Sequence, residues 1–298
     1  MTPALVLLLA VIGVSFSGPL VRLSHADPLA IAAWRLGFSL LVIGAILLAQ
    51  GSWRQWRRLS RADLRLALGA GVLLALHFWS WNTSIGLTTV AASVVLVNTH
   101  PVFVAVASVL WLQEPPSRRQ WIGIAIAMVG ALVVALPDLR GGGDALHGHA
   151  LLGDVLAVLG AVTVAGYFVI GRRLRATLDL WPYVGLVYGT SFLVLLMLAT
   201  VTGARLGGQP PRELAIFASL ALGPMLLGHT GFNWALKHLP AYVVNVTLLG
   251  EPVGATMLAA LLPGIRELPG LFTILGGALI LAGILATAQR AEPRAAEG

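Results

Sequence analysis

The sequence consists almost entirely of apolar stretches that are long enough to cross a lipid bilayer. A helix needs about 20 apolar residues to span the hydrocarbon core. Hydrophobic residues make up 58% of the 298 residues and charged residues only 10%, whereas a soluble domain carries roughly a quarter charged residues. The sequence therefore predicts an all-α membrane protein. Ten transmembrane helices are expected, at 3–24, 28–49, 66–86, 90–112, 119–137, 150–172, 180–202, 214–236, 240–263 and 269–288.

The ten stretches form two sets of five, and the same landmark residues recur in both sets. The matched residues lie 147 to 153 positions apart. They are Gly13 with Gly160, Asn82 with Asn233, Pro101 with Pro252, Glu114 with Glu267, Gly123 with Gly276, and Gly130 with Gly283. Chance similarity between apolar helices is the alternative explanation. Because five is odd, the second set would cross the bilayer upside down, which is the inverted-repeat architecture of small-molecule transporters.

This interpretation divides the chain into four segments. They are a first five-helix repeat at 1–137, a Gly-rich linker at 138–149, a second five-helix repeat at 150–288 and a cytoplasmic tail at 289–298. The glycine triplet of the linker is typical of a flexible connection. We expect the two inverted repeats to surround a central cavity, with the binding site near the membrane midplane.

Basic residues in the short loops predict the orientation of the chain. Thirteen of them fall on one side of the ten-helix arrangement and five on the other, while Arg35 lies within a helix. Cytoplasmic loops carry the excess of Lys and Arg. Eighteen Arg against one Lys indicates a GC-rich bacterial genome. We therefore predict a multi-pass protein of the bacterial cytoplasmic (inner) membrane with both termini cytoplasmic. The net charge of +7 forms no continuous patch, which argues against nucleic acid as a partner.

Four segments resemble signatures of the EamA-type transporters in the drug/metabolite transporter superfamily. They are 92–103 (ASVVLVNTHPVF), like the family's fourth helix; 111–115 (WLQEP), like its acidic exit; 152–157 (LGDVLA), like the start of the second repeat; and 247–253 (TLLGEPV), like the ninth-helix motif. The resemblance covers nearly the whole chain. It implies a transporter and favours export, but says little about the substrate. His100 departs from the family, which more often has a small or acidic residue before this proline.

Two titratable side chains lie near the middle of predicted helices, each directly before a proline. Glu251 precedes Pro252, and its repeat mate His100 precedes Pro101. A proline removes a backbone donor and leaves a carbonyl of the preceding turn unpaired. A carboxylate or imidazole beside such a carbonyl is suited to bind a substrate ammonium group or a proton. The alternative is a purely structural role, in which both side chains pack against each other or bond to Ser and Thr.

Further polar and aromatic residues follow helical spacing and would face the same cavity. Together with the two proline-linked residues they make up the predicted substrate-binding set: His77, Trp81, His100, Tyr167, His229, Asn233, Tyr242 and Glu251. The alternative for the polar members is helix–helix adhesion, a common role of such side chains in membranes. Trp81 is equally suited to the membrane interface. Arg35, seven residues into its helix, is expected to snorkel outward rather than to pair with an acidic residue.

The function predicted from these features is secondary transport by alternating access. The chain would export a small amphipathic metabolite such as an amino acid, with the lipid bilayer as its other partner and protons as a candidate coupling ion. No GxxxxGK[ST] loop is present, so we expect no ATP drive and no cofactor. An intramembrane metal-dependent enzyme is the alternative, with His77, His100, His229 and Glu251 as ligands, although HExxH and GxSxG are absent. The Asp144, His147 and His149 cluster is a weaker metal candidate.

Overall fold

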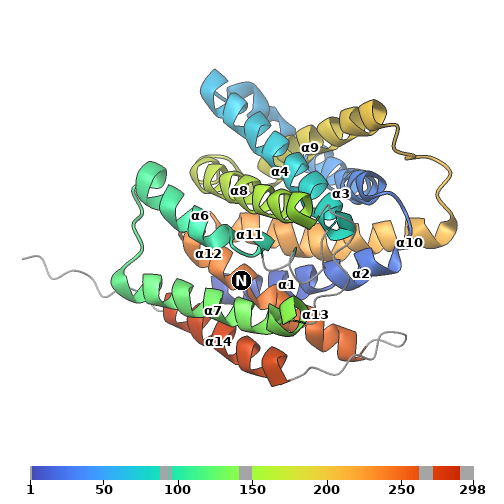
Figure 1. Ribbon diagram of the computed structural model, residues 1–298. Helices are drawn as coiled ribbons and strands as arrows, with labels where there is room; N and C mark the ends of the chain where they lie inside the picture. The colour runs from blue at the N-terminus through green and yellow to red at the C-terminus, as the bar shows by residue number, and fades with distance from the viewer. Residues whose placement is uncertain (1, 88–92, 94–95, 141–149, 262–270, 289–298) are drawn as a thin grey trace, which may run out of the picture.

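The computed structural model describes residues 2–87, 93, 96–140, 150–261 and 271–288, and these residues form helices and no strands. The first half contains α1 (Pro3–Ser15), α2 (Ser17–Leu23), α3 (Pro28–Gln50), η1 (Ser52–Arg58), α4 (Arg61–Leu87), α6 (His100–Ala107), η2 (Ser108–Leu112) and α7 (Arg118–Arg140). The second half contains α8 (Ala150–Leu174), α9 (Leu180–Thr202), α10 (Pro211–Leu220), η3 (Ala221–His229), α11 (Thr230–Ala235), α12 (Ala241–Leu248), α13 (Gly250–Leu261) and α14 (Leu271–Ala288). Figure 1 shows these helices as one bundle.

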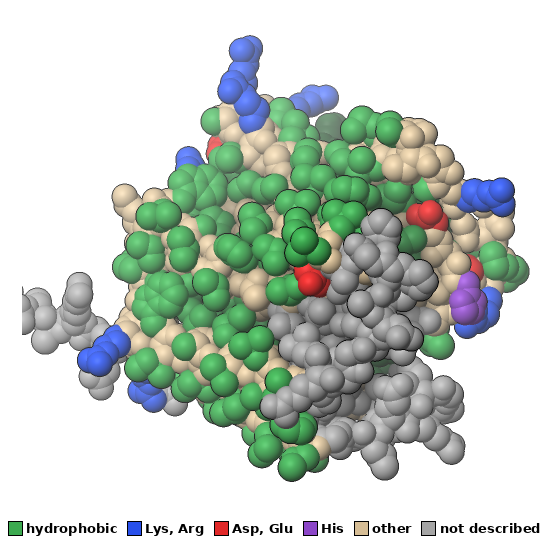
Figure 2. Space-filling model, viewed as in Figure 1, with side chains coloured by type: hydrophobic (Ala, Val, Ile, Leu, Met, Phe, Trp, Pro, Cys, Tyr) green, Lys and Arg blue, Asp and Glu red, His purple; other side chains and the backbone are tan. Residues whose placement is uncertain are grey.

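Six helical segments in the described residues are long and apolar enough to cross a membrane. They are Pro3–Val21, Pro28–Gln50, Arg61–Ser84, Leu151–Leu174, Leu180–Thr202 and Pro211–Ala235, and each corresponds to a predicted transmembrane helix. The face in Figure 2 is covered largely by hydrophobic side chains, with Lys and Arg at its margins. Leu41, Leu48 and Leu110 are 70–78% exposed, which only a lipid environment makes favourable for so many large apolar side chains.

Several predicted helices are interrupted or differ in length from expectation. The segment 3–24 is divided between α1 and α2, and a turn at 98–99 lies within the segment 90–112. The segment 214–236 is interrupted by the π-helix η3, which contains Pro224. The segment 240–263 is divided between α12 and α13. The helix predicted to end at 137 continues to Arg140, so the predicted linker begins inside α7. The rest of that linker and the predicted tail lie outside the described residues.

Local signals explain where the second transmembrane helix begins and ends. The Asp27 side chain caps α3 by accepting a hydrogen bond from the Leu29 backbone N–H at 2.8 Å. Pro28 occupies the first turn, where its missing N–H costs nothing. Gly51 ends the helix with φ +62°, a left-handed conformation that favours glycine.

Helices α7 and α14 lie side by side and run antiparallel (Figure 1). A Cβ atom on Gly123 would lie 2.8 Å from the Gly283 carbonyl oxygen, and one on Gly130 would lie 2.7 Å from the Gly276 carbonyl oxygen. Residue numbers thus rise along one helix as they fall along the other. The glycines let the two backbones approach closely, which is how helices without a hydrophobic driving force pack in membranes.

The remaining contacts join the two halves at several places. Helix α4 packs against α8 and α9, and α1 packs against η3 and α11. Glycines again mark the close approaches. Gly160 of α8 faces Ser80 and Trp81 of α4, while Gly13 of α1 faces the backbone of Gly223 and Gly228. The two halves of the chain are therefore interleaved, and the space between them is lined by both.

The α7–α14 contact should be intolerant of a single added methyl group. We expect Gly130→Ala to destabilise the protein by about 1–3 kcal/mol, because the new Cβ overlaps backbone atoms that cannot move away cheaply. Thermal unfolding of the purified protein in detergent measures the change. The matched control is Gly189→Ala, whose Cβ meets nothing within 4 Å and which should leave the midpoint unchanged or raise it. Equal midpoints for the two variants would contradict the packing.

Candidate functional site

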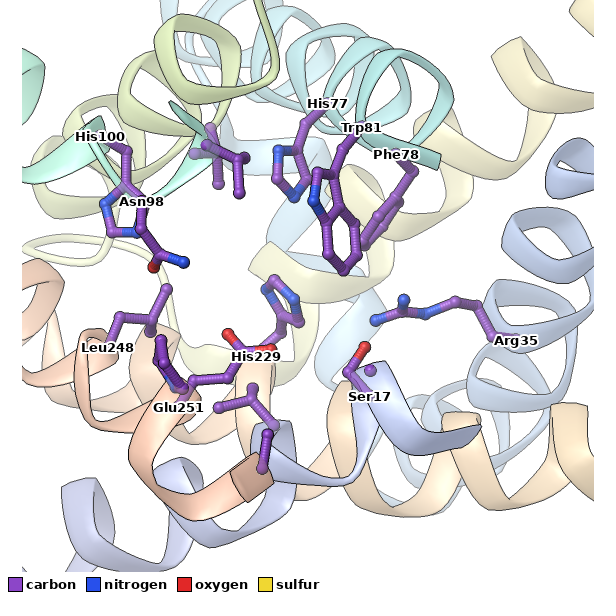
Figure 3. A pocket seen from close by; sticks show the side chains of 16 residues that line it. Ser17, Arg35, His77, Phe78, Trp81, Asn98, His100, His229, Leu248 and Glu251 are labelled. Carbon is purple, nitrogen blue, oxygen red and sulfur yellow. The ribbon is translucent and has the colours of Figure 1, made fainter. Parts of the chain in front are cut away.

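A cavity of about 110 Å³ lies between the two halves of the chain, and Figure 3 shows the side chains that line it. The first half contributes residues of α1, α2, α3, α4 and α6, and the second half contributes residues of α8, η3, α12 and α13. The volume equals that of a few water molecules at about 30 Å³ each, and ligand pockets usually reach about 300 Å³ or more. The structure therefore holds this cavity in a narrow form.

The cavity lies where two helices are interrupted. A turn at Asn98 and Thr99 precedes α6, which begins at His100. A break at Leu249 separates α12 from α13, whose second residue is Glu251. A proline follows two or three residues after each interruption, and it cannot donate a hydrogen bond to the preceding turn. Interrupted transmembrane helices expose backbone groups only where they line a cavity, and transporter binding sites are built this way.

Five of the eight residues predicted to bind substrate line the cavity. They are His77, Trp81, His100, His229 and Glu251. His77 stacks on Trp81 with an interplanar angle of 8°, and its Nδ1 lies 3.0 Å from the Gly160 carbonyl oxygen. A carbonyl oxygen can only accept, so Nδ1 of His77 carries the proton. In the neutral form of the ring, Nε2 is then the acceptor.

The other three predicted residues do not line this cavity, and their polar groups form hydrogen bonds to other helices. Asn233 donates through Nδ2 to the hydroxyl groups of Tyr167 and, at 3.3 Å, Tyr188. All three side chains are fully buried, and they join α8, α9 and α11. Tyr242 donates instead to Gln120 Oε1 at 3.0 Å, which joins α12 to α7. Helical spacing had placed these residues on inward faces, but their depth along the helix depends on neighbours that the spacing does not reveal.

Arg35 is the lining residue whose position differs most from expectation. Its side chain is 1% exposed and points inward, so the prediction that it snorkels outward is wrong. The guanidinium lies 4.3 Å from the centre of the Phe78 ring, and its Nη2 contacts the Met225 sulfur at 2.9 Å. Seven residues correspond to about 10 Å of helix, which is too deep for easy escape toward water. This depth was the sequence signal that could have indicated burial.

The contacts of Arg35 are weak compensation for a buried charge. Removing a charge from water costs several kcal/mol even after relaxation. A desolvated cation–π contact stabilises by about 2 kcal/mol, and a thioether sulfur is only a weak acceptor. The Nε atom of Arg35 is buried and has no hydrogen-bond partner. The cavity therefore contains a positive charge that the protein leaves poorly satisfied.

Polar contacts also join the halves near the helix ends, away from the cavity. Arg172 binds Glu114 at 2.7 Å and also donates to the Leu236 carbonyl oxygen at 2.7 Å. At another set of helix ends, Glu213 accepts from the Ser24 hydroxyl at 2.5 Å and from the His25 backbone N–H at 3.2 Å. Each cluster connects segments that are far apart in the sequence.

A metal-dependent enzyme finds no support in the described residues. The structure forms no group of three or more His, Cys, Asp or Glu side chains that could hold a metal ion in the part of the chain it describes. His77, His100, His229 and Glu251 line one cavity without meeting that geometry. The Asp144, His147 and His149 cluster lies outside the described residues.

Comparison with known proteins points to transporters. The EamA-like transporter family matches residues 1–136 and again residues 151–289. An uncharacterized transporter of Synechocystis sp. is 23% identical over 282 residues, covering 86% of this chain and 84% of the relative. The uncharacterized transporter YdfC of Bacillus subtilis is 26% identical over 253 residues, covering 84% and 79%. A solved crystal structure superposes with a TM-score of 0.77 at 17% identity, covering 96% of both chains, and supports the fold alone.

The packing role of Asn233 can be tested by stability. We expect Asn233→Leu to destabilise the protein by about 1–3 kcal/mol, because it leaves the buried tyrosine hydroxyl groups without their shared donor. Thermal unfolding in detergent measures the loss, with Thr202→Val at an exposed helix end as the matched control. An unchanged unfolding midpoint combined with lost transport would contradict the packing role and support the prediction that Asn233 binds substrate.

Proposed function

Because the chain belongs to the EamA-like transporter family, which matches both of its halves, we propose that it exports a small amphipathic metabolite, such as an amino acid, by alternating access. The protein is a multi-pass membrane transporter. The observation that carries the proposal is the cavity between the halves, at the two helix interruptions, which His, Arg and Glu side chains help to line. Burying His, Arg and Glu side chains within a membrane is costly, and such residues usually mark a substrate or ion pathway.

We propose further that the chain forms ten transmembrane helices as two inverted repeats. The antiparallel α7 and α14 support this, because they are the fifth and tenth helices and would run the same way in direct repeats of even length. The glycine contacts support it as well. Gly276 is the repeat mate of Gly123, and Gly130 is the repeat mate of Gly283. The Gly123–Gly283 contact and the Gly276–Gly130 contact are therefore equivalent under the repeat. A two-fold axis lying in the membrane plane produces this exchange.

The neighbours of the other helices support the same two-fold relation. Helix α4, the third, packs against α8, the sixth, while α11 and η3 of the eighth pack against α1, the first. Gly13 and Gly160 are repeat mates, and each provides the close approach in its own contact. The second and seventh helices, α3 and α9, pack against each other, as helices beside the axis would.

Within this proposal, the cavity residues divide into two kinds. Glu251 and His100, beside their prolines, would handle a cationic group or a proton. Trp81, Phe78 and Leu248 would contact the apolar part of the substrate. Phe78 and Leu248 were not in the predicted substrate-binding set, whereas its members Tyr167 and Tyr242 do not line the cavity. The narrow cavity would widen when the substrate enters.

The two polar clusters at the helix ends would close the cavity in turn. With both termini placed in the cytoplasm, Glu114 and Arg172 lie on the cytoplasmic side, and Ser24 and Glu213 lie on the opposite side. Each cluster connects the first half to the second. Rocking of the halves would break one cluster and preserve the other, which is what alternating access requires.

The role of Glu251 is tested by removing its charge. We expect Glu251→Gln to abolish transport or to remove its dependence on a pH gradient, because the amide neither binds a proton nor attracts an ammonium group. Counterflow of labelled metabolites in proteoliposomes, with and without a pH gradient, measures the effect. The matched control is Asp179→Asn, a carboxylate 63% exposed outside the cavity. Wild-type transport by the Glu251 variant at every pH would remove this residue from the mechanism.

The cytoplasmic closure can be tested by thiol labelling, because the chain contains no cysteine. We introduce Ala255→Cys at the cavity wall and compare it with and without Glu114→Gln. Losing the Arg172–Glu114 ion pair should cost about 1 kcal/mol and shift the population roughly fivefold toward the open cavity.

The readout is the labelling rate with a membrane-impermeant thiol reagent applied from the cytoplasmic side of inverted vesicles. The same reagent applied from the other side provides the control, and its rate should fall. Equal rates with and without Glu114→Gln from both sides would show that this ion pair does not hold the cavity closed.

A further inference from the structure

The cavity contains a positive charge that the proposed function does not use. Arg35 is the one Arg or Lys among the described residues that line the cavity, and Glu251 is the one acidic residue among them. Arg35 extends from α3 in the first half, and Glu251 extends from α13 in the second half. Figure 3 shows the two side chains entering the same space from different sides, with the labelled His229 and Ser17 between them.

The two charges are not neutralised by direct pairing. The ion pairs found within 4 Å in the described residues are Arg172–Glu114, Arg212–Glu213 and Lys237–Asp179, and none involves Arg35. The guanidinium instead contacts a ring face and a sulfur atom. A guanidinium can donate two parallel N–H hydrogen bonds to one acceptor group, and neither of these contacts uses that capacity.

Neighbouring side chains hold the guanidinium in place for such an acceptor. Phe78 covers one face of the plane, and Met225 of η3 lies at its edge. A thioether sulfur is a weak acceptor, so a carboxylate oxygen would form a stronger bond to the guanidinium than Met225 does. The Arg35 backbone belongs to α3, where the Ser39 hydroxyl donates a hydrogen bond to the Arg35 carbonyl oxygen at 2.7 Å.

We propose that Arg35 binds the carboxylate of the transported molecule, while Glu251 faces its cationic end. The carboxylate matches the planar fork of the guanidinium and supplies the acceptor that this buried group lacks. The inference rests on the proposed function, because it concerns the same cavity. It narrows the substrate class to molecules that bear a carboxylate.

A carboxylate fits the cavity better than a phosphate. A phosphate ester carries nearly two negative charges. The cavity lining contains one permanent cation, Arg35, and it also contains the carboxylate of Glu251. The small volume also favours a compact head group. A singly charged carboxylate is therefore the anion whose charge Arg35 alone balances.

The first experiment compares ligands on the wild-type protein. Purified protein in detergent is titrated with the twenty α-amino acids, with their decarboxylated amines and with the matching carboxylic acids that lack the amine. The shift in thermal unfolding midpoint gives the affinity of each compound. We expect at least one compound with a carboxylate to bind, and its decarboxylated amine to bind at least tenfold more weakly.

The outcomes separate this inference from the proposed function. If amines bind as tightly as their parent amino acids and exchange in counterflow, transport stands and the carboxylate site falls. If carboxylates and amines neither bind nor exchange, the proposal that this cavity carries such metabolites falls as well, and the Arg35 site falls with it.

The second experiment measures, in variants of the protein, the ratio of the affinity for the carboxylate compound to the affinity for its decarboxylated amine. Arg35→Gln should reduce the preference for the carboxylate at least tenfold and retain amine binding, and Arg35→Lys should give an intermediate preference, because it keeps the charge and loses the fork. Arg205→Gln, exposed outside the cavity, is the matched control. A merely structural Arg35 would change the unfolding midpoint and leave the ratio unchanged. If Arg35→Gln does not fold, the lysine variant and the ligand series on the wild-type protein still test whether Arg35 binds the carboxylate.

Discussion

A bilayer offers no hydrogen-bond partner to a buried polar group, and this constraint accounts for most of the structure. The chain satisfies it by placing its intramembrane His, Arg and Glu side chains on a shared cavity between the two halves. The backbone must still come close enough to enclose that cavity. Gly13 provides such an approach between α1 and η3, because a Cβ atom there would lie 2.9 Å from the Gly223 carbonyl oxygen and the Gly228 backbone nitrogen. Gly123 and Gly130 do the same between α7 and α14.

The sequence was informative where one residue type has a local consequence. Pro101 and Pro252 marked two interrupted helices, and both interruptions line the cavity with the residues before the prolines. The length and hydropathy of the apolar stretches located the long helices to within a few residues. Local chemistry decides these features, so no knowledge of the partners was needed.

Features that depend on partners could not be predicted from the sequence. Arg35 points inward because Phe78 and Met225, from two other helices, hold its guanidinium. Tyr167 lies on an inward face, as its spacing indicated, but Asn233 binds it away from the cavity. A helical period gives the direction of a side chain around its helix. It says nothing about which neighbour lies at the same depth.

The proposed two-fold relation explains why the site can be asymmetric on a symmetric scaffold. His100 and Glu251 occupy equivalent positions, yet one is an imidazole and the other a carboxylate. At the offset of 147 that pairs Trp34 with Trp181, the mate of Arg35 is Pro182, which carries no charge. Divergence between the repeats has thus placed the cation on one half and the acid on the other. A ligand with two unlike ends would bind in one orientation only, and rocking of the halves would change the distance between the groups that hold those ends. The affinity of the cavity would therefore depend on the conformation, which is the differential binding that lets a substrate shift a conformational equilibrium.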